Sequence, residues 1–283
     1  MASELIEAVQ KRVTTLQKED NGLVFPAGYN IGNALNYANL IISQDYALNN
    51  TDQGSKIQAL LDMTLQGLSP EKKQGYFIKR GNNLTFMRSY FGSVSVLNRL
   101  PGVERVWAKE VHEGEQFEID ADEHGRLLVD YHPSFACQDA PIIGAFACVE
   151  ETDGTRTYTV MTKREIDQSW SHTSTKNNKV QTEFPQEMAK RTVLNRATKM
   201  FINTLDMNQN IAGAVNRSTE NEYDDEKPKG RRRDVTPAED KNADFDKFLD
   251  DYQAEQNTPA PDPATDTDAG YDQPTLGEAT ADA

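Results

Sequence analysis

Basic and aromatic side chains are concentrated between residues 67 and 109. Eight lysines and arginines lie between Lys72 and Lys109 against a single acid, Glu104, although the chain of 283 residues carries a net charge of −15. Aromatic residues are interleaved with them, as in the run GYFIKR that begins at Gly75. Cations neutralise phosphates, and flat rings stack on exposed bases. The segment therefore predicts a surface that holds single-stranded nucleic acid.

A hairpin is expected to carry part of this surface. Alternating residues at 75–79 and 84–88 flank a turn, and closing this turn with Lys79 opposite Leu84 also sets Phe77 opposite Phe86. One face then carries Phe77, Lys79, Leu84, Phe86 and Arg88, and the other carries Tyr76, Ile78, Thr85 and Met87. We interpret the first face as a stacking platform for bases. The alternative is that its two phenylalanines fill a core.

A second basic stretch lies on a helix expected at residues 185–205. At about 100° per residue its apolar side chains occupy one arc and most of its cations the other, with Lys190 inside the apolar arc. A lysine at that position either pairs with an acid such as Glu187 or points toward a ligand, and we favour the ligand. The cations of this helix expected at phosphates are Lys190, Arg191, Arg196 and Lys199.

The remaining periodicity predicts an α+β fold. Its N-terminal part is helical, its central β-sheet is mostly antiparallel and packed with helices, and a long C-terminal helix completes the core. The helices expected besides that one lie at 4–18, 32–43, 56–66 with Ser55 as its cap, 91–100 and 163–170. The strands expected beyond the hairpin lie at 103–111, 116–119, 127–131, 142–149 and 157–161.

The composition changes after residue 216. Residues 219–283 hold 19 acids against 7 bases and few apolar residues, which predicts a disordered acidic tail. We expect an N-terminal helical arm at 1–29, a core at 30–216 and the tail at 217–283. Within the tail, residues 244–252 could form a short acidic helix that docks on a protein partner or folds back on the basic groove. Its apolar stripe consists of Phe245, Phe248, Leu249 and Tyr252.

Several classes of protein are disfavoured by the sequence. Cys137 and Cys148 lack CxxC spacing, and no stretch reaches the roughly 18 apolar residues of a membrane span, so we expect a cytoplasmic protein without membrane contact. No G-x-x-x-x-G-K-[ST] phosphate loop is present, so an ATP-driven reaction is not expected.

Two stretches resemble the RecT family of phage single-strand annealing proteins. The first resembles the family's passage from a helix through G-L-x-P and a hairpin into a Y-x-G helix, and reads GLSPEKKQGYFIKRGNNLTFMRSYFGSVSVLNR. The second resembles the family's later MA-x-[KR]-T helix and reads EMAKRTVLNRATK. The resemblance covers about residues 30–210. It departs from the family at Tyr90-Phe91-Gly92, where a Tyr-Lys-Gly is common and a cation is therefore missing.

The resemblance implies ATP-independent annealing of complementary strands in phage-type homologous recombination. It implies a homo-oligomeric ring or helical filament on single-stranded DNA and on annealed duplex, a partner exonuclease, and the host single-strand-binding protein in the bacterial cytoplasm. It implies no catalytic site and no cofactor, with Mg²⁺ only as a modulator of DNA binding. The residues that we expect to contact DNA are Lys72, Lys73, Phe77, Lys79, Arg80, Phe86, Arg88, Lys190, Arg191, Arg196 and Lys199.

Two other functions stay open on the sequence. A metal-dependent nuclease could use Glu71 and Lys72-Lys73 with Asp62 upstream, and histidines at 112, 124 and 132, although Asp62 is expected in a helix rather than at a strand end. An RNA-binding or scaffolding protein is the other alternative, because no residue pattern reports contact with a 2′-hydroxyl group.

Overall fold

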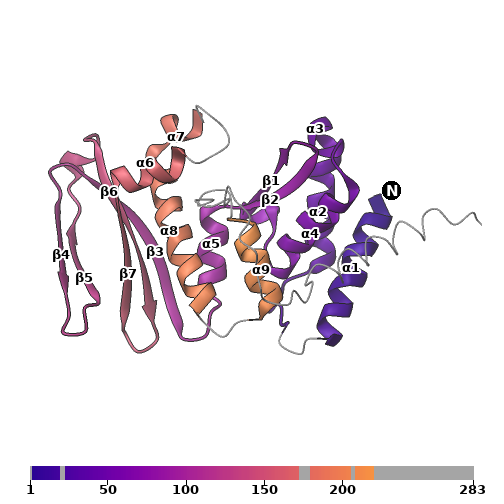
Figure 1. Ribbon diagram of the computed structural model, residues 1–283, viewed down its shortest axis with the longest axis horizontal. Coiled ribbons are helices and arrows are strands. Elements are labelled where there is room, and N and C mark those ends of the chain that lie inside the picture. Colours follow the sequence, from indigo (N-terminus) through magenta and orange to yellow (C-terminus); the bar gives the residue numbers. More distant parts are fainter. Residues whose placement is uncertain (1, 20–22, 172–178, 205–207, 220–283) are drawn as a thin grey trace, which may run out of the picture. The chain divides into compact units, whose positions relative to one another are not determined.

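The computed structural model describes residues 2–19, 23–171, 179–204 and 208–219 (Figure 1). The acidic tail from residue 220 and the docking segment predicted at 244–252 lie outside the described residues. The predicted α+β fold is confirmed. The helices are α1 (Ala2–Glu19), α2 (Ile31–Gln44), α3 (Tyr46–Asn49), α4 (Gln53–Leu65), α5 (Tyr90–Leu97), α6 (Lys163–Ser171), α7 (Lys179–Glu183), α8 (Pro185–Thr204) and α9 (Gln209–Arg217), with 3-10 turns η1 (Pro70–Lys72) and η2 (Phe135–Cys137).

The strands form antiparallel pairs. They are β1 (Gly75–Arg80), β2 (Asn83–Arg88), β3 (Val103–His112), β4 (Gln116–Ala121), β5 (Leu127–His132), β6 (Ile142–Glu151) and β7 (Arg156–Thr162). Strands β3, β6 and β7 form one sheet in that order, whereas β1–β2 and β4–β5 are separate hairpins. The predicted register of the first hairpin is confirmed, with Phe77 opposite Phe86 and Lys79 opposite Leu84.

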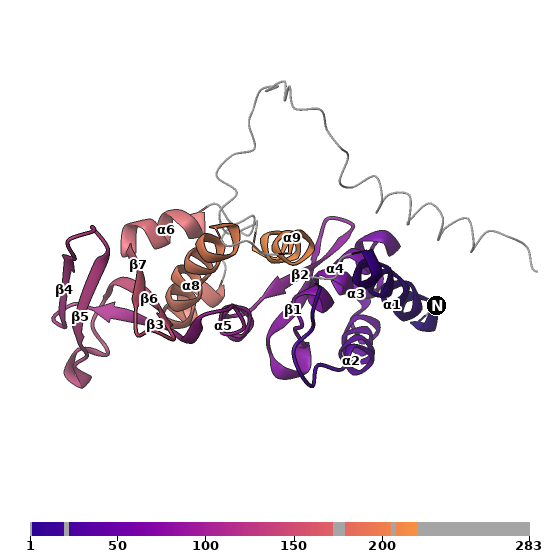
Figure 2. The same cartoon turned by 90° about the horizontal axis from the view of Figure 1, so that it is seen from below.

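Helices pack on the two strand systems in different ways. Helices α6 and α8 lie against the sheet of β3, β6 and β7, and the β4–β5 hairpin lies beside the sheet's other face (Figures 1 and 2). A cluster of rings joins that hairpin to the sheet, since Phe117 and Tyr131 both contact Phe146. The β1–β2 hairpin instead rests on α4, which also contacts α1, α2 and α9. Among the described helices, none is long and apolar enough to cross a bilayer.

The start of α4 differs from the prediction. Asp52, not Ser55, is the N-cap, and its carboxylate accepts the backbone N–H of Ser55 at 2.8 Å. The Ser55 hydroxyl donates to the Asp52 carbonyl at 2.7 Å and accepts the backbone N–H of Leu84 at 2.9 Å. The second bond ties the hairpin to α4, so the serine also positions β2.

The arc of α8 opposite its apolar side chains is partly buried, although Arg196 on it is exposed. Thr192, Asn195 and Thr198 are each at most 1% exposed, because α8 lies between the sheet on one side and α5 and α9 on the others. Met200, an apolar residue of the same helix, is 46% exposed. Helix α9 was not predicted, although Asn208 caps it and Ala214 and Val215 are fully buried.

Gly92 allows α5 to sit directly on the loop before β1. A Cβ atom at residue 92 would overlap the carbonyl oxygen of Gln74 and would lie 2.6 Å from Cγ of Arg88. We expect Gly92→Ala to lower the free energy of unfolding by about 1–3 kcal/mol, because it overpacks this contact. Denaturant titration measures the change.

Gly32 in α2 is the matched control for this substitution. A Cβ there would meet side-chain atoms at 3.4 and 3.8 Å, and alanine favours helices over glycine. Gly32→Ala should therefore leave stability unchanged or raise it. Equal losses in the two variants would contradict the role assigned to Gly92.

Candidate nucleic-acid interface

The predicted stacking platform is part of the core. Phe77 is 7% and Phe86 is 1% exposed, and their ring centroids lie 5.5 Å apart on the hairpin face that rests on α4. A two-stranded hairpin needs such backing, because alone it is marginally stable in water. The register was right but the face was wrong, so neither ring is available to a base in this structure.

Arg88 is also unavailable to a phosphate. Its side chain is 0% exposed, although we expected it beside the strand. Its guanidinium donates to Ser93 Oγ at 2.8 Å, Gln66 Oε1 at 3.0 Å and Ser218 Oγ at 3.2 Å. Ser93 in turn donates to Asn195 at 2.7 Å. This network connects β2 with α4, α5, α8 and the end of α9, so Arg88 is a structural residue.

The outward face of the hairpin presents the ring that the prediction missed. Tyr76 is 41% exposed, and the Arg191 guanidinium lies 5.5 Å from its ring centroid. An arginine over a ring is a cation–π contact, and it places the first half of α8 beside β1. Tyr76 and Arg191 therefore offer a ring and a cation together. The sequence contained this information, because adjacent residues of a strand face opposite sides, so Tyr76 is exposed if Phe77 is buried.

The loop before β1 holds two exposed lysines in a fixed conformation. Lys72 ends η1, and Lys73 adopts φ 54°, a left-handed conformation that costs a non-glycine residue about 1–2 kcal/mol. Ser89 Oγ donates to the Lys73 carbonyl at 2.6 Å, and Gln74 accepts from the Ser69 N–H at 3.0 Å. These bonds hold the strained residue, so Lys72 and Lys73 are presented from a rigid loop.

The first turn of α5 lies against the same loop. Ser89 caps this helix and bonds the Lys73 carbonyl, and Phe91 in the first turn is 59% exposed with its ring edge-on to Tyr90. An exposed ring thus stands where the family often has a lysine. We name the group of Lys72, Lys73, Tyr76, Phe91 and Arg191 the strand-binding surface, after the function that the sequence predicts for this region.

Two other predicted cations of α8, Lys190 and Arg196, are engaged with acids. Lys190 lies 2.6 Å from Glu187 and 3.8 Å from Glu110, which is the paired alternative. Burial alone would lower the pKa of Lys190, but the hydrogen bond to Glu187 and the charge of Glu110 raise it. Arg196 lies 3.4 Å from Glu165. A phosphate would have to displace these carboxylates, so DNA contact by Lys190 and Arg196 stays a prediction, as it does for Lys199.

Two predicted residues lie near the turn of the hairpin. Lys79 is exposed and donates to the carbonyl of Asn50 at 3.2 Å, and Arg80 is half-buried with Nη2 3.7 Å from the sulfur of Met87. Lys79 can exchange this single carbonyl for a phosphate. Both stay predicted DNA contacts at the edge of the strand-binding surface.

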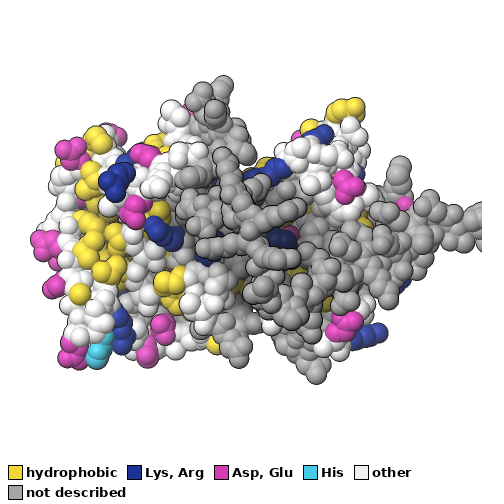
Figure 3. All heavy atoms as spheres, viewed as in Figure 1, with side chains coloured by type: hydrophobic (Ala, Val, Ile, Leu, Met, Phe, Trp, Pro, Cys, Tyr) yellow, Lys and Arg dark blue, Asp and Glu magenta, His cyan; other side chains and the backbone are white. Residues whose placement is uncertain are grey.

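The β4–β5 hairpin is unsuited to nucleic acid. On the face shown in Figure 3, apolar side chains gather over the region of β4, β5 and β7, and acidic ones lie around them. The exposed carboxylates on this hairpin include Glu118, Asp120 and Asp130. Their charge would repel phosphates, which leaves the β1–β2 side as the candidate interface.

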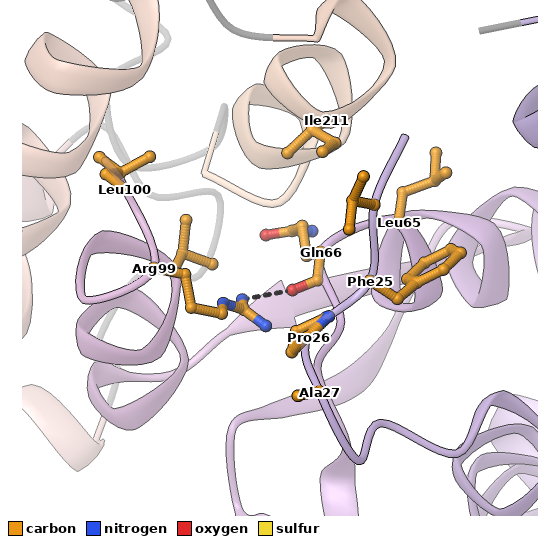
Figure 4. Close-up of a pocket in the computed structure, with 10 residues that line it drawn as sticks. Phe25, Pro26, Ala27, Leu65, Gln66, Arg99, Leu100 and Ile211 are labelled. Atoms are coloured by element: carbon orange, nitrogen blue, oxygen red, sulfur yellow. Dashed lines mark hydrogen bonds between the residues drawn. The ribbon is translucent and has the colours of Figure 1, made fainter. Parts of the chain in front are cut away.

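A pocket of about 400 Å³ lies away from these cations, at the end of α4 (Figure 4). It is mostly apolar, with Phe25, Leu65 and Ile211 among its walls. Its charged residue, Arg99, donates to the carbonyls of Gln66 and Gly67 at the end of α4. Arg99 therefore caps a helix end. Its guanidinium is engaged with backbone carbonyls rather than open to a phosphate.

The nuclease alternative gains nothing from the described residues. They contain no group of three or more histidines, cysteines and acids that could hold a metal ion. Asp62 is 6% exposed and accepts two bonds from Arg217 at 2.8 and 3.0 Å, so it joins α4 to α9. His112 is buried and its Nδ1 lies 2.7 Å from the carbonyl of Ala140.

Comparison with known families matches the RecT family over residues 33–234. The chain belongs to the RecT family. The matched range contains every residue of the strand-binding surface and the whole Arg88 network. Protein RecT of Escherichia coli (strain K12) is 27% identical over 163 residues, which are 54% of this chain and 60% of that protein. The chain thus matches less than two thirds of the length of that relative.

Membership of the RecT family associates this chain, in general terms, with single-strand annealing in DNA recombination. The structure gives the glycine of the Y-x-G motif a physical reason. Gly92 leaves room for the Gln74 carbonyl, against which α5 packs, whereas Phe91 at the middle position is exposed.

Proposed function

We propose that this RecT-family protein binds single-stranded DNA on the strand-binding surface and anneals complementary strands without ATP. The observation that carries the proposal is the pairing of exposed Tyr76 with Arg191, beside Lys72 and Lys73, within the range matched by the family. Cations fix the phosphates, and rings hold bases by stacking, which tolerates any sequence. Annealing needs no further chemistry than holding a strand with its bases open to a partner.

The finer parts of the function are proposals of the same kind. We propose that the protein works as a homo-oligomer on DNA in the bacterial cytoplasm, with a partner exonuclease that supplies single strands and the host single-strand-binding protein. The family membership supports these partners, whereas the geometry supports only the contact with the strand. Mg²⁺ is proposed as a modulator of DNA binding and not as a cofactor.

Annealing of labelled oligonucleotides tests the proposal. Two complementary strands carrying a donor and an acceptor dye are mixed with full-length protein and no ATP, across a range of Mg²⁺ concentrations. We expect duplex to form faster than without protein. A non-complementary pair is the control, and intact strands on a denaturing gel exclude cleavage.

Two results would contradict the proposal. Duplex formation that is no faster with protein at any Mg²⁺ concentration would overturn annealing. The same assay with two RNA strands tests the alternative, since stronger binding and faster pairing of RNA than of DNA would favour an RNA-binding protein.

A further inference from the structure

A second hollow adjoins the strand-binding surface. It has a volume of about 450 Å³, which falls within the range of about 300–1,000 Å³ typical of small-molecule sites. It lies where α2 and α3 meet the start of β1. Lys73 and Tyr76 are shared between the hollow and the surface, so a strand that contacts both residues passes over its mouth.

The walls of this hollow suit a flat ring. Ile41, Leu48 and Pro70 provide aliphatic surface, and Tyr76 provides an aromatic ring. Leu48 and Pro70 are buried, so this part of the wall is fixed. Aliphatic and aromatic walls stabilise any nucleobase by dispersion and stacking, because every base has a flat face.

The rim of the hollow carries one charge of each sign, Lys73 and Asp45. The Asp45 carboxylate is oriented by the start of α3, where Oδ1 accepts the N–H groups of Ala47 and Leu48 at 2.7 and 3.1 Å. A fixed carboxylate accepts hydrogen bonds from the amino group of a base, as acids do with cytosine. Lys73 can hold the phosphate of the same nucleotide.

We propose that this hollow takes one nucleobase of the bound strand, turned out of the stack, with the Lys73 amine on its phosphate and the Asp45 carboxylate on its amino group. The proposal rests on the proposed function, because the strand must first lie on the strand-binding surface. Adenine, cytosine and guanine have an amino group and thymine has none, so thymine binds worst in this pocket.

The test uses oligonucleotides with 2-aminopurine, a fluorescent base that has an amino group, placed at a different position in each strand. Bound to the full-length protein, a subset of positions should show quenching by acrylamide reduced about tenfold, because a pocket can leave only about a tenth of a ligand's surface accessible. Ile41→Trp fills the hollow and should abolish this protection. Strand affinity should change by about twofold or less, because phosphate contacts supply most of it.

Leu40→Trp is the matched control. Leu40 is the neighbouring residue of α2, is 48% exposed and does not line the hollow, so this variant should keep the protected positions. Asp45→Asn is a second variant, because asparagine also caps helices and removes only the negative charge. It should reduce protection even if Ile41→Trp fails to fold.

The outcomes separate the two proposals. Wild-type protein that binds the strand but leaves the acrylamide quenching of every position unchanged from that of the free strand overturns the pocket alone. The same protection in wild type, Ile41→Trp and Asp45→Asn also overturns it. Wild-type protein that binds no single strand overturns the proposed function and the pocket together.

Discussion

Arg88→Ala is expected to lower the free energy of unfolding by about 2–5 kcal/mol. The substitution opens a cavity where the structure has a fully buried side chain, and it removes donors from Gln66, Ser93 and Ser218. Buried polar groups that lose a partner carry the whole cost of their desolvation. Urea titration followed by circular dichroism measures the loss.

Lys79→Ala is the control for Arg88. It removes a cation from the same hairpin face, but Lys79 is exposed and bonds one carbonyl, so stability should change by about 0.5 kcal/mol or less. If Arg88→Ala were as stable as wild type and instead bound DNA with a flatter salt dependence, Arg88 would be a DNA contact and the structural role would be wrong.

The double substitution Lys72→Gln with Lys73→Gln is expected to weaken single-strand binding about 10- to 30-fold at about 0.1 M salt. Each phosphate contact on a single strand contributes a slope of about 0.7 in a plot of log affinity against log salt, so the slope should flatten by about 1.4. Both lysines are exposed, and glutamine keeps their size, so the fold should be unaffected. Fluorescence anisotropy at several salt concentrations measures the slope.

Lys11→Gln with Lys18→Gln makes the same change of charge on α1. These lysines are exposed, and α1 packs on α2 and α4 rather than on the hairpin. We expect little change in affinity or slope. Equal effects of the two double variants would mean that only the overall charge matters, and no effect of the first would remove Lys72 and Lys73 from the site.

The hairpin shows what could be predicted from the sequence and what could not. Its register follows from alternation and turn length, which are local. Both of its faces carry rings or aliphatic groups, so the buried one is decided by α4, which arrives from elsewhere in the chain. The sequence pattern therefore placed Phe77 and Phe86 opposite each other correctly, but it could not tell them from Tyr76 as the exposed ring.

Charged residues were harder to assign than apolar ones. Ser93, one partner of Arg88, is near it in the sequence, whereas Gln66 lies 22 residues away and Ser218 lies 130 residues away, so the local pattern does not mark Arg88 as buried. The ion pair of Lys190 was easier to predict, because its partner Glu187 is one helical turn away and was named as an alternative to a ligand. Helix α9 was missed because its apolar face is short and precedes a long polar tail.

The Arg88 network also sets an order in which the protein can complete its folding during synthesis. Arg88 leaves the ribosome long before Val215 and Ser218, which accept its hydrogen bonds at 3.3 and 3.2 Å. Until those residues emerge, the guanidinium at the centre of the hairpin, α4 and α5 lacks part of its acceptors. Contacts this distant in sequence slow folding, because a long loop must close before they form. This network therefore stays incomplete until the chain has been made as far as Ser218.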